Sequence, residues 1–346
     1  MRVVLALGPS TGGIGTYVRA LAEYCVASGD QVVVVGPETT EQHFSFTATG
    51  ARFVPLCRLL RTLKHADVVH SHGFKAAALV NSALAGRHTP RHIVTLHNTL
   101  PAAGIKALVG RLAVRPSDVV LCASSDLVQR ARELGARSVS LCPVPAPPLP
   151  IHTRSRTDIR RELAIPDDES LLLTVGRLAP QKSLPLLLDA VAALPDLRLR
   201  LVIAGEGPER FALSARIESE KLPVTLLGHR QDIVDLLSAA DLFVLSSQWE
   251  ARALVVQEAM RAGVPVIATE VGGLPELVGD AAMLVPSNNA PALASEIRRV
   301  LTDPALRDEL RAAGPARATE WPSYADALAV ARGWYAKPSL RPRRCG

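Results

Sequence analysis

Two glutamates eight positions apart, Glu250 and Glu258, are the side chains of this 346-residue chain that most directly suggest chemistry. The apolar runs 242–245 before them and 264–268 after them each predict a buried parallel strand. Residues 254–262 between these runs have helix-forming composition and end at Gly263. Glu250 should therefore follow a strand and Glu258 should lie in the next helix, at the rim where an open α/β sheet binds ligands.

Such a pair of glutamates has three possible interpretations. The two carboxyl groups could serve as acid and base in a glycosidase. Each could instead accept two hydrogen bonds from neighbouring hydroxyls of a sugar or a ribose. In the third case Glu258 merely decorates the start of a helix. The surrounding motifs must decide among these.

A basic pair follows the first strand predicted in the second half of the chain. Residues 176–183 read Gly-Arg-Leu-Ala-Pro-Gln-Lys-Ser, close to the phosphate-binding loop (P-loop) of NTPases. Gln181 replaces the second glycine that such a loop needs to fold around phosphates, which argues against an NTPase. Arg177 and Lys182 remain as donors for a diphosphate, or as two solvated surface cations.

The first half offers a glycine turn and three histidines. Gly12 and Gly13 lie between a predicted strand and a predicted helix, where backbone N–H groups can approach a phosphate. Val18 stands where a dinucleotide fingerprint has its third glycine, which weakens an NAD interpretation. His97, His70 and His72 end predicted strands, but no Cys, Asp or Glu cluster completes a metal site.

The elements that must position these residues form two α/β halves. Strands are predicted at 3–7, 31–35, 68–69, 93–96 and 119–123, and again at 171–175, 199–204, 224–226, 242–245 and 264–268. Strands that alternate with helices predict parallel sheets. The proline-rich run 143–150 is a linker. Residues after Ala290 are expected to be helical to about Ala336, with breaks at Pro315 and Pro322.

Composition narrows the class of protein. Aromatic residues make up only 4% of the chain and the net charge is +6 with scattered basic residues, which argues against nucleic-acid binding. Five cysteines without a C-x-x-C pair favour a reducing, cytoplasmic compartment. No apolar run approaches the roughly 20 residues of a membrane span. The oligomeric state is left open.

Seven segments in order carry a family resemblance: GGIGTYV, DVVHSHG, TLHN, VGRLAPQKSLPLLLDA, LVIAGEGPE, LLGH with DIVDLLSAADLFVLSS, and EAMRAGVPVIATEVGGLPELV. Together they resemble the retaining GT-B glycosyltransferases of sequence family 4, over about residues 3–335. The resemblance implies two doubly wound, Rossmann-like domains facing a central cleft. Their expected ranges are 1–147 and 148–322, with a last helix near 323–337 that packs back on the first domain.

The resemblance also assigns roles to residues. Arg177 and Lys182 would neutralise the donor diphosphate, Glu258 would bind the ribose, Glu250 the transferred sugar, and His97 would lie near that sugar. Further donor contacts are expected at Gly12, Gly13, Gly176, Gly205, His229, Arg252, Ala253 and Leu254. The donor would be a UDP-, GDP- or ADP-sugar and the acceptor a hydroxyl group, with no metal or other cofactor.

One loop departs from the family pattern. The family usually has E-G-F-G-L, whereas this chain has Glu250-Ala251-Arg252-Ala253-Leu254. Losing both glycines narrows the loop's conformations, while Arg252 could contact a phosphate or the acceptor. Alternatives to a transferase are a sugar-nucleotide epimerase of the same fold and an inactive homologue that binds the donor.

Two basic segments raise the question of a membrane. Residues 56–64 and 106–115 are basic and amphipathic. Either they contact anionic lipid at the inner face of a membrane, or they cover a sheet and present a solvated basic face. A liposome flotation assay separates these outcomes.

Overall fold

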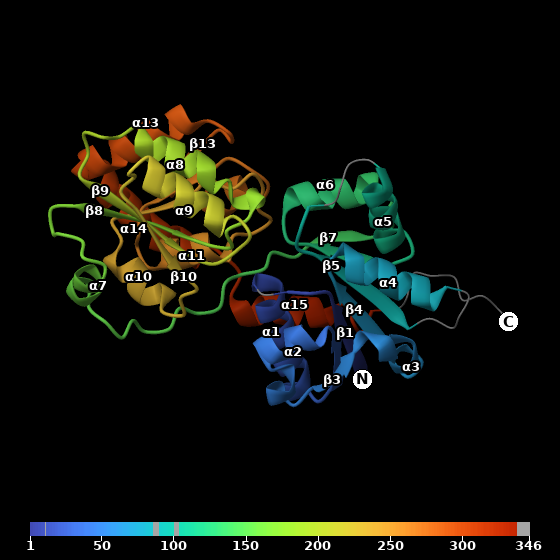
Figure 1. The fold of residues 1–346 in the computed structure, drawn as a ribbon. Helices are drawn as coiled ribbons and strands as arrows, with labels where there is room; N and C mark the ends of the chain where they lie inside the picture. Colours follow the sequence, from blue (N-terminus) through green and yellow to red (C-terminus); the bar gives the residue numbers. More distant parts are fainter. Residues whose placement is uncertain (11, 86–89, 100–103, 338–346) are drawn as a thin grey trace. The chain divides into compact units, whose positions relative to one another are not determined.

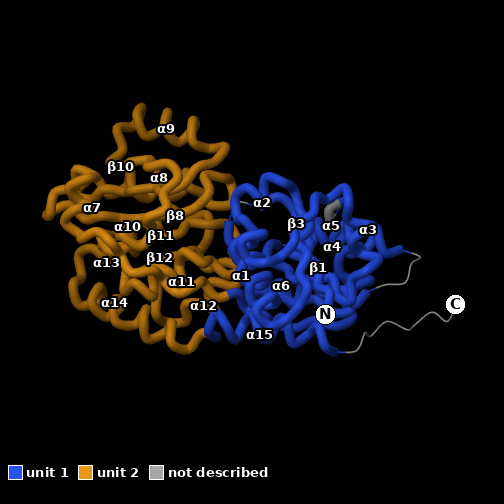
Figure 2. Tube along the Cα trace, turned by 90° about the horizontal axis from the view of Figure 1, so that it is seen from below, with its two compact units in different colours: residues 1–144, 322–346 blue, residues 145–321 orange. Residues whose placement is uncertain are grey.

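The computed structural model describes residues 1–10, 12–85, 90–99 and 104–337. Packing divides the chain into two compact units, which Figure 2 distinguishes by colour. Unit 1 comprises residues 1–144 together with the returning segment 322–346, and unit 2 comprises residues 145–321. Each unit is an α/β layer structure, as the alternating pattern predicted.

Unit 1 is built on a seven-stranded, wholly parallel sheet of order β3-β2-β1-β4-β5-β6-β7. Burial on both faces explains why its central strands read as continuous apolar runs. The strands are β1 Arg2–Leu7, β2 Gln31–Gly36, β3 Arg52–Pro55, β4 Val68–His72, β5 Arg91–Leu96, β6 Val119–Cys122 and β7 Val139–Leu141.

The helices of unit 1 cover this sheet unevenly (Figure 1). Helix α3 has five residues and α4 has eleven, so α3 covers less of the sheet than α4 does. The helices are α1 Gly13–Ala27, α2 Glu38–Phe44, α3 Leu59–Leu63, α4 Phe74–Leu84, α5 Gly104–Val114, α6 Ser125–Glu133 and α15 Tyr324–Gly333, with 3₁₀ turns at Phe46–Thr49 and Leu56–Arg58.

Helix α15 belongs to unit 1 although it ends the described chain. Arg332 on this helix forms an ion pair with buried Asp30 at 2.7 Å. Just beyond the helix, the Tyr335 hydroxyl lies 2.8 Å from Nδ1 of His70, and Arg91 Nε donates to the Trp334 carbonyl at 2.8 Å. These buried contacts attach the returning segment to α1 and the first sheet.

Unit 2 has a six-stranded parallel sheet of order β10-β9-β8-β11-β12-β13. Two separate hydrophobic clusters lie on its faces. One face is covered by α7, α10, α11 and α12, and the other by α8, α9, α13 and part of α14. The strands are β8 Ser170–Val175, β9 Leu199–Ala204, β10 Val224–Gly228, β11 Leu242–Leu245, β12 Val266–Thr269 and β13 Met283–Val285.

The helices predicted at 254–262 and after Ala290 are present, but the last run breaks at Asp303 rather than at Pro315. Pro315 does not break the chain, because α14 continues through it. Gly314 of α14 approaches the Met260 backbone of α11 so closely that a Cβ would lie 3.0 Å from the Met260 oxygen. This packing outweighs the local cost of proline. The helices are α7 Arg156–Glu162, α8 Leu184–Ala192, α9 Arg210–Ser219, α10 Ile233–Ala239, α11 Leu254–Arg261, α12 Leu274–Val278, α13 Ala290–Thr302 and α14 Pro304–Thr319, with a 3₁₀ turn at Pro180–Lys182.

The proline-rich linker is irregular but anchored. Its Ala146 N–H donates to Oε1 of Gln257 at 2.8 Å, and Arg261 donates to the Ala146 and Pro147 carbonyls at 2.8 and 3.0 Å. Gln257 and Arg261 lie on α11, the helix that also carries Glu258. The linker is therefore fixed to the helix in which sequence analysis placed a ligand-binding residue.

Both sheets change strand order beside their first strand. In unit 1, β1 and β4 are neighbours, and the chain continues from β1 to β2 on one side and from β4 to β5 on the other. In unit 2, β8 and β11 are neighbours, and the chain continues to β9 on one side and to β12 on the other. Loops that leave the carboxyl ends of such strands diverge and leave room for a ligand. The loops after β8 and β11 contain Arg177, Lys182 and Glu250.

Candidate functional site

An ion pair joins the two loops at the switch point of unit 2. Lys182 Nζ lies 2.7 Å from Oε1 of Glu250, and both side chains are largely buried. Ser247 donates to the same carboxylate oxygen at 2.7 Å. Sequence analysis selected Lys182 and Glu250 separately; the structure brings them together and adds Ser247.

Backbone contacts hold these two loops in register. The Gln248 N–H donates to the Gln181 carbonyl at 2.7 Å, and the Gln181 side chain donates to the Trp249 carbonyl at 2.8 Å. Ser246 donates to the Lys182 carbonyl at 2.9 Å. Gln181, whose presence argued against a phosphate-binding loop, therefore fixes the position of the loop that carries Glu250.

The neighbouring loops pack too closely to accept side chains. A Cβ on Gly205 would lie 1.9 Å from the Gly176 carbonyl oxygen, and Gly205 has a φ of 152°. A Cβ on Gly207 would lie 2.3 Å from the Leu178 oxygen. The Gly205 N–H also donates to the Gly228 carbonyl at 2.7 Å. Gly176 and Gly205 thus keep the loops after β8, β9 and β10 in contact.

The unusual loop after Glu250 has a packing explanation. Ala251 and Ala253 are only 5% and 4% exposed, so their methyl groups fill space inside unit 2. Gly273 donates to the Glu250 carbonyl at 2.8 Å and fixes the start of the loop. Ala253 is the N-cap of α11 and supplies no side-chain cap. The first N–H groups of α11, beginning at Leu254, therefore remain available to an oxygen-rich ligand.

Arg252 lies against Trp321, with its guanidinium carbon 6.0 Å from the ring centroid. Burial lowers the pKa of Arg252 to about 10. Its Nε is buried and has no hydrogen-bond partner among the described residues. The structure therefore gives this side chain a packing role, and its expected contact with a phosphate or an acceptor remains a hypothesis.

Glu258 is a half-buried carboxyl group on α11. Burial raises the pKa of Glu258 to about 7, against the opposing effect of Arg261. The folded chain thus holds an acceptor that is only half ionised at neutral pH. Hydrogen-bond donors from a ligand would favour the ionised form.

Arg177 is the exposed cation of this rim, directly after β8. No carboxylate of the described residues lies within ion-pair distance of its guanidinium. A cation without a partner next to the Lys182–Glu250 pair leaves the site with excess positive charge. That excess suits an anionic ligand such as a diphosphate.

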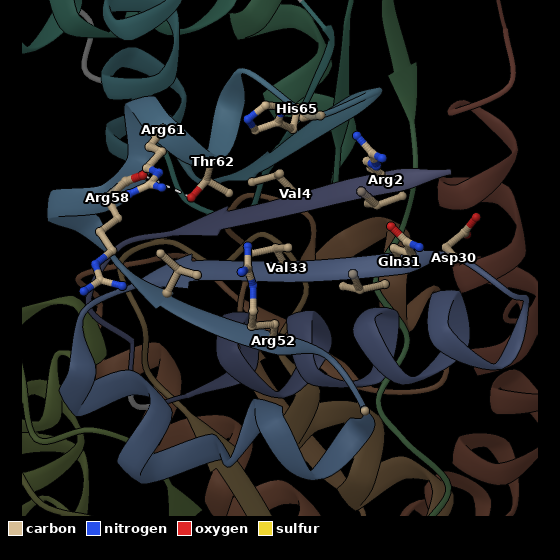
Figure 3. A pocket seen from close by; sticks show the side chains of 15 residues that line it. Arg2, Val4, Asp30, Gln31, Val33, Arg52, Arg58, Arg61, Thr62 and His65 are labelled. Atoms are coloured by element: carbon tan, nitrogen blue, oxygen red, sulfur yellow. Dashed lines mark hydrogen bonds between the residues drawn. The ribbon is translucent and has the colours of Figure 1, made fainter.

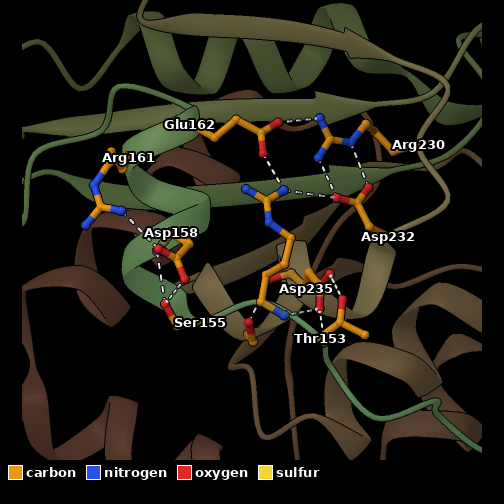
Figure 4. A network of polar contacts seen from close by, with 10 residues as sticks. Thr153, Ser155, Asp158, Arg161, Glu162, Arg230, Asp232 and Asp235 are labelled. Atoms are coloured by element: carbon orange, nitrogen blue, oxygen red, sulfur yellow. Dashed lines mark hydrogen bonds and ion pairs between the residues drawn. The ribbon is translucent and has the colours of Figure 1, made fainter.

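His229 is exposed after the edge strand β10. Its neighbour Arg230 is held by carboxylates, at 2.7 Å from Asp232 and 2.8 Å from Glu162, as Figure 4 shows. These hydrogen bonds, first to Asp232 and then to Glu162, raise the pKa of Arg230. Arg230 therefore fixes the loop and leaves His229 free to meet a ligand.

In unit 1 the glycine turn leads into α1. Gly12 and Gly13 are exposed, and a Cβ on Gly12 would meet nothing within 4 Å. Gly15 differs, because its Cβ would overlap the Phe44 ring at 2.0 Å. Gly15 therefore serves packing, while Gly12 and Gly13 present open backbone at a helix start.

The histidines of unit 1 form a buried group around His97. Nδ1 of His72 lies 3.3 Å from Nε2 of His97, and the Tyr17 ring packs edge-on against both imidazoles. Burial lowers the pKa of His97 to about 4 and that of His70 to about 3, and it lowers the pKa of His72 as well. All three imidazoles are therefore neutral at physiological pH, and one nitrogen of each can donate a hydrogen bond.

Two family models match the two halves of the chain. The glycosyl transferase 4-like domain matches residues 12–147, and glycosyl transferases group 1 matches residues 155–317. The second match contains Arg177, Lys182, Glu250 and Glu258 in the geometry just described. The chain belongs to the group 1 glycosyltransferases.

Relatives of this glycosyltransferase have varied names. TuaC of Bacillus subtilis, named as a teichuronic acid biosynthesis glycosyltransferase, is 32% identical over 70% of this chain and 64% of its own length. A GDP-mannose-dependent phosphatidylinositol dimannoside mannosyltransferase of Mycobacterium tuberculosis is 27% identical over 88% of both chains. The chain spans less than two thirds of TuaC.

Solved structures share the fold over almost the whole chain. Sucrose-phosphate synthase of Thermosynechococcus elongatus has a TM-score of 0.78 at 24% identity, covering 97% of this chain and 98% of its own. HepE of Anabaena in complex with UDP has a TM-score of 0.84 at 19% identity, covering 97% of this chain and 100% of its own. These likenesses confirm the predicted GT-B architecture.

The described part of the chain contains no group of three or more His, Cys, Asp or Glu side chains arranged to hold a metal. None of its helices is both long enough and apolar enough to span a bilayer.

Several residues that contact the candidate residues within each unit were not predicted from the sequence. Ser247 could have been predicted as a hydrogen-bond donor to Glu250, because it lies three positions before that residue in the same loop. Tyr17 and Gly207 gave no sequence signal, because an aromatic ring in a helix or a glycine in a loop has many uses. Gly272 also belongs here, since a Cβ on it would lie 2.1 Å from the Glu250 carbonyl oxygen.

Proposed function

We propose that this chain is a retaining, metal-independent glycosyltransferase that moves a hexose-type sugar from a nucleotide-diphosphate sugar to a hydroxyl acceptor. The observation that carries the proposal is the 2.7 Å pair of Lys182 and Glu250 at the switch point of unit 2, beside unpaired Arg177. That arrangement offers two cations to a diphosphate and one carboxylate to sugar hydroxyls.

Leaving-group stabilisation is the main catalytic contribution in this proposal. The bond between the anomeric carbon and the diphosphate oxygen breaks, and negative charge develops on that oxygen. Arg177 and Lys182 would neutralise this charge from fixed positions, which costs no reorganisation during the reaction. Because the Lys182 ammonium is already held by Glu250, the site is organised before the donor arrives.

Retention of configuration would follow from attack on the same face. The acceptor hydroxyl forms the new bond to the anomeric carbon as the nucleotide leaves, and its proton passes to the departing diphosphate oxygen. Glu250 would hold hydroxyls of the sugar, and Glu258 those of the ribose. In this scheme Glu250 is a hydrogen-bond acceptor whose charge is already committed to Lys182, which disfavours a role as nucleophile.

His97 would donate a hydrogen bond to the transferred sugar. Its depressed pKa keeps the ring neutral, so it can donate without adding a charge. Further donor contacts are proposed at Gly12 and Gly13 of unit 1 and, in unit 2, at Gly176, Gly205, His229, Arg252, Ala253 and Leu254. Two observations support a nucleotide-sugar donor: HepE was solved with UDP, and the mycobacterial relative is named for GDP-mannose.

A donor panel tests the proposal. The purified chain is incubated with UDP-, GDP- and ADP-sugars, with and without a chelator, and release of nucleotide diphosphate is measured. We expect one nucleotide to be preferred, release to survive the chelator, and the product anomer to match the donor by NMR. A changed sugar still attached to its nucleotide would indicate an epimerase, and binding without turnover would indicate an inactive homologue.

We further propose that α5 makes peripheral contact with anionic membrane. Its outer face carries Ile105, Leu108 and Leu112, which are 83%, 55% and 46% exposed. Exposed Arg111 lies on the same helix. The other basic segment, residues 56–64, buries Leu59 and Leu63 against the sheet. Flotation with phosphatidylglycerol vesicles should fail for Ile105→Ser combined with Leu108→Ser; unchanged flotation would refute the contact.

A further inference from the structure

Unit 1 contains a large basic recess that the proposed reaction does not use. It has a volume of about 870 Å³ and lies over β1, β2 and β3 beside α3 (Figure 3). Arg2 and Arg52 are the first residues of β1 and β3, so the recess reaches the amino ends of the strands. A ligand crevice of a doubly wound sheet lies at the opposite, carboxyl ends. The recess is therefore separate from the candidate site.

The recess exists because α3 is short. This helix covers the sheet through Leu59 and Leu63, and it ends before it can cover the amino ends of the strands. Val4 and Val33 consequently form part of the floor, with the polar Gln31 beside them (Figure 3). A helix of ordinary length would fill this volume with its own side chains.

Positive charge surrounds this floor on several sides. Arg2, Arg52, Arg58, Arg61 and His65 all line the recess, and all five are exposed. The four arginines come from β1, β3, the 3₁₀ turn Leu56–Arg58 and α3, so guanidinium groups lie on several sides of the floor (Figure 3). Among the described residues, no carboxylate forms an ion pair with any of the four arginines.

The acidic residue of the lining does not offset this charge. Asp30 is buried and is already paired with Arg332 at 2.7 Å. Burial acts to raise its pKa, but Arg332 and the N-terminal ammonium of Met1 together outweigh burial and keep the pKa of Asp30 low. Four guanidinium groups around one recess repel one another, and a multivalent anion would relieve that repulsion.

We propose that this recess binds a soluble small molecule that carries at least two phosphate groups. The volume matches the range of about 300–1,000 Å³ typical of small-molecule sites. Planar guanidinium groups match phosphate oxygens in pairs. A ligand that reaches cations on three elements at once must enter the recess, which a flat bilayer surface does not do. The site is independent of the proposed transfer reaction.

Inorganic tripolyphosphate is the probe, and calorimetry and thermal unfolding of the full chain are the measurements. Because Arg177 and Lys182 could also bind it, the background is Arg177→Ala with Lys182→Ala. We expect this background to bind tripolyphosphate, and added Arg52→Ser with Arg61→Ser to weaken binding at least tenfold. Arg19→Gln, an exposed arginine of α1 outside the recess, is the matched control and should change nothing.

A second readout separates binding from folding. Without ligand and at low salt, Arg52→Ser with Arg61→Ser should raise the unfolding midpoint, and roughly 0.5 M NaCl should remove the gain because salt screens repulsion. If that variant folds poorly, Arg58→Ser replaces it with the same expectations. Equal tripolyphosphate binding by the recess variant would overturn the proposal. So would recess-dependent binding to phosphatidylglycerol vesicles without binding to tripolyphosphate.

Discussion

Replacing Glu258 by glutamine should stabilise the fold and weaken donor binding. Burial raises the pKa of this carboxyl group to about 7 from its ordinary 4.5. At about 1.4 kcal/mol for each factor of ten, keeping the group ionised costs the folded chain roughly 3 kcal/mol at high pH. This is an upper bound, since solvent partly screens a half-buried group. Glutamine has the same shape and carries no charge, so Glu258→Gln removes the cost.

The pH dependence of stability shows where Glu258→Gln should be more stable than the wild type. Below pH 4.5 both the folded and the unfolded chain carry the proton, and the substitution should change little. Between 4.5 and 7 the unfolded chain releases the proton while the folded chain keeps it, so wild-type stability falls as pH rises. Above about pH 8 the advantage of Glu258→Gln should reach its full value.

Denaturant unfolding at pH 4, 6 and 8 measures this difference, and calorimetry measures donor binding. The control is Glu218→Gln, an exposed glutamate on α9. Wild-type donor affinity should rise with pH through 7, and Glu258→Gln should lose at least about tenfold at pH 8, because an amide presents one acceptor oxygen in place of two. Equal stability of the wild type and Glu258→Gln at pH 8 would refute the claim that the folded chain buries an ionised Glu258. A stabilised variant with unchanged donor affinity would refute the ribose contact.

Two further predictions concern packing. Gly205→Ala should lower the free energy of unfolding by at least about 2 kcal/mol, because the new Cβ would overlap backbone atoms. Gly333→Ala is the control and should be neutral, because there is open space around Gly333. Equal effects of the two substitutions would contradict the loop packing. Tyr335→Phe should cost about 1–2 kcal/mol, as measured by thermal unfolding, because Nδ1 of His70 loses its buried partner while Nε2 keeps its contact with Thr95. Tyr24→Phe, where the described residues show no side-chain hydrogen bond, is its control; a neutral Tyr335→Phe would argue against the attachment of the returning segment.

The architecture could be predicted because the strands are buried on both faces. Such strands read as apolar runs, and every run named in the sequence is a strand in the structure. The strands that gave no such signal, β3, β7 and β13, lie at sheet edges and have four or three residues. The prediction of a break at Pro315 was wrong because helix propensity is a local quantity, whereas the contact of α14 with α11 is not.

The candidate site was predicted as single residues but not as an assembly. Charge and position after a strand selected Lys182 and Glu250, but nothing in the sequence indicated that they bind each other. The family motifs suggested donor contacts for Ala253 and Arg252, while the structure shows a buried methyl group and a cation packed on Trp321. Burial, which also sets the pKa of Glu258, depends on distant segments and cannot be read from spacing.

Turnover of the preferred nucleotide sugar by Lys182→Ala is the most direct test of the proposed function. The matched control is Lys221→Asn, an exposed lysine in left-handed backbone, which asparagine tolerates. We expect Lys182→Ala to keep a cooperative unfolding transition and to lose at least about a hundredfold in release of nucleotide diphosphate, while Lys221→Asn turns over normally. Near-normal turnover by folded Lys182→Ala would contradict the account.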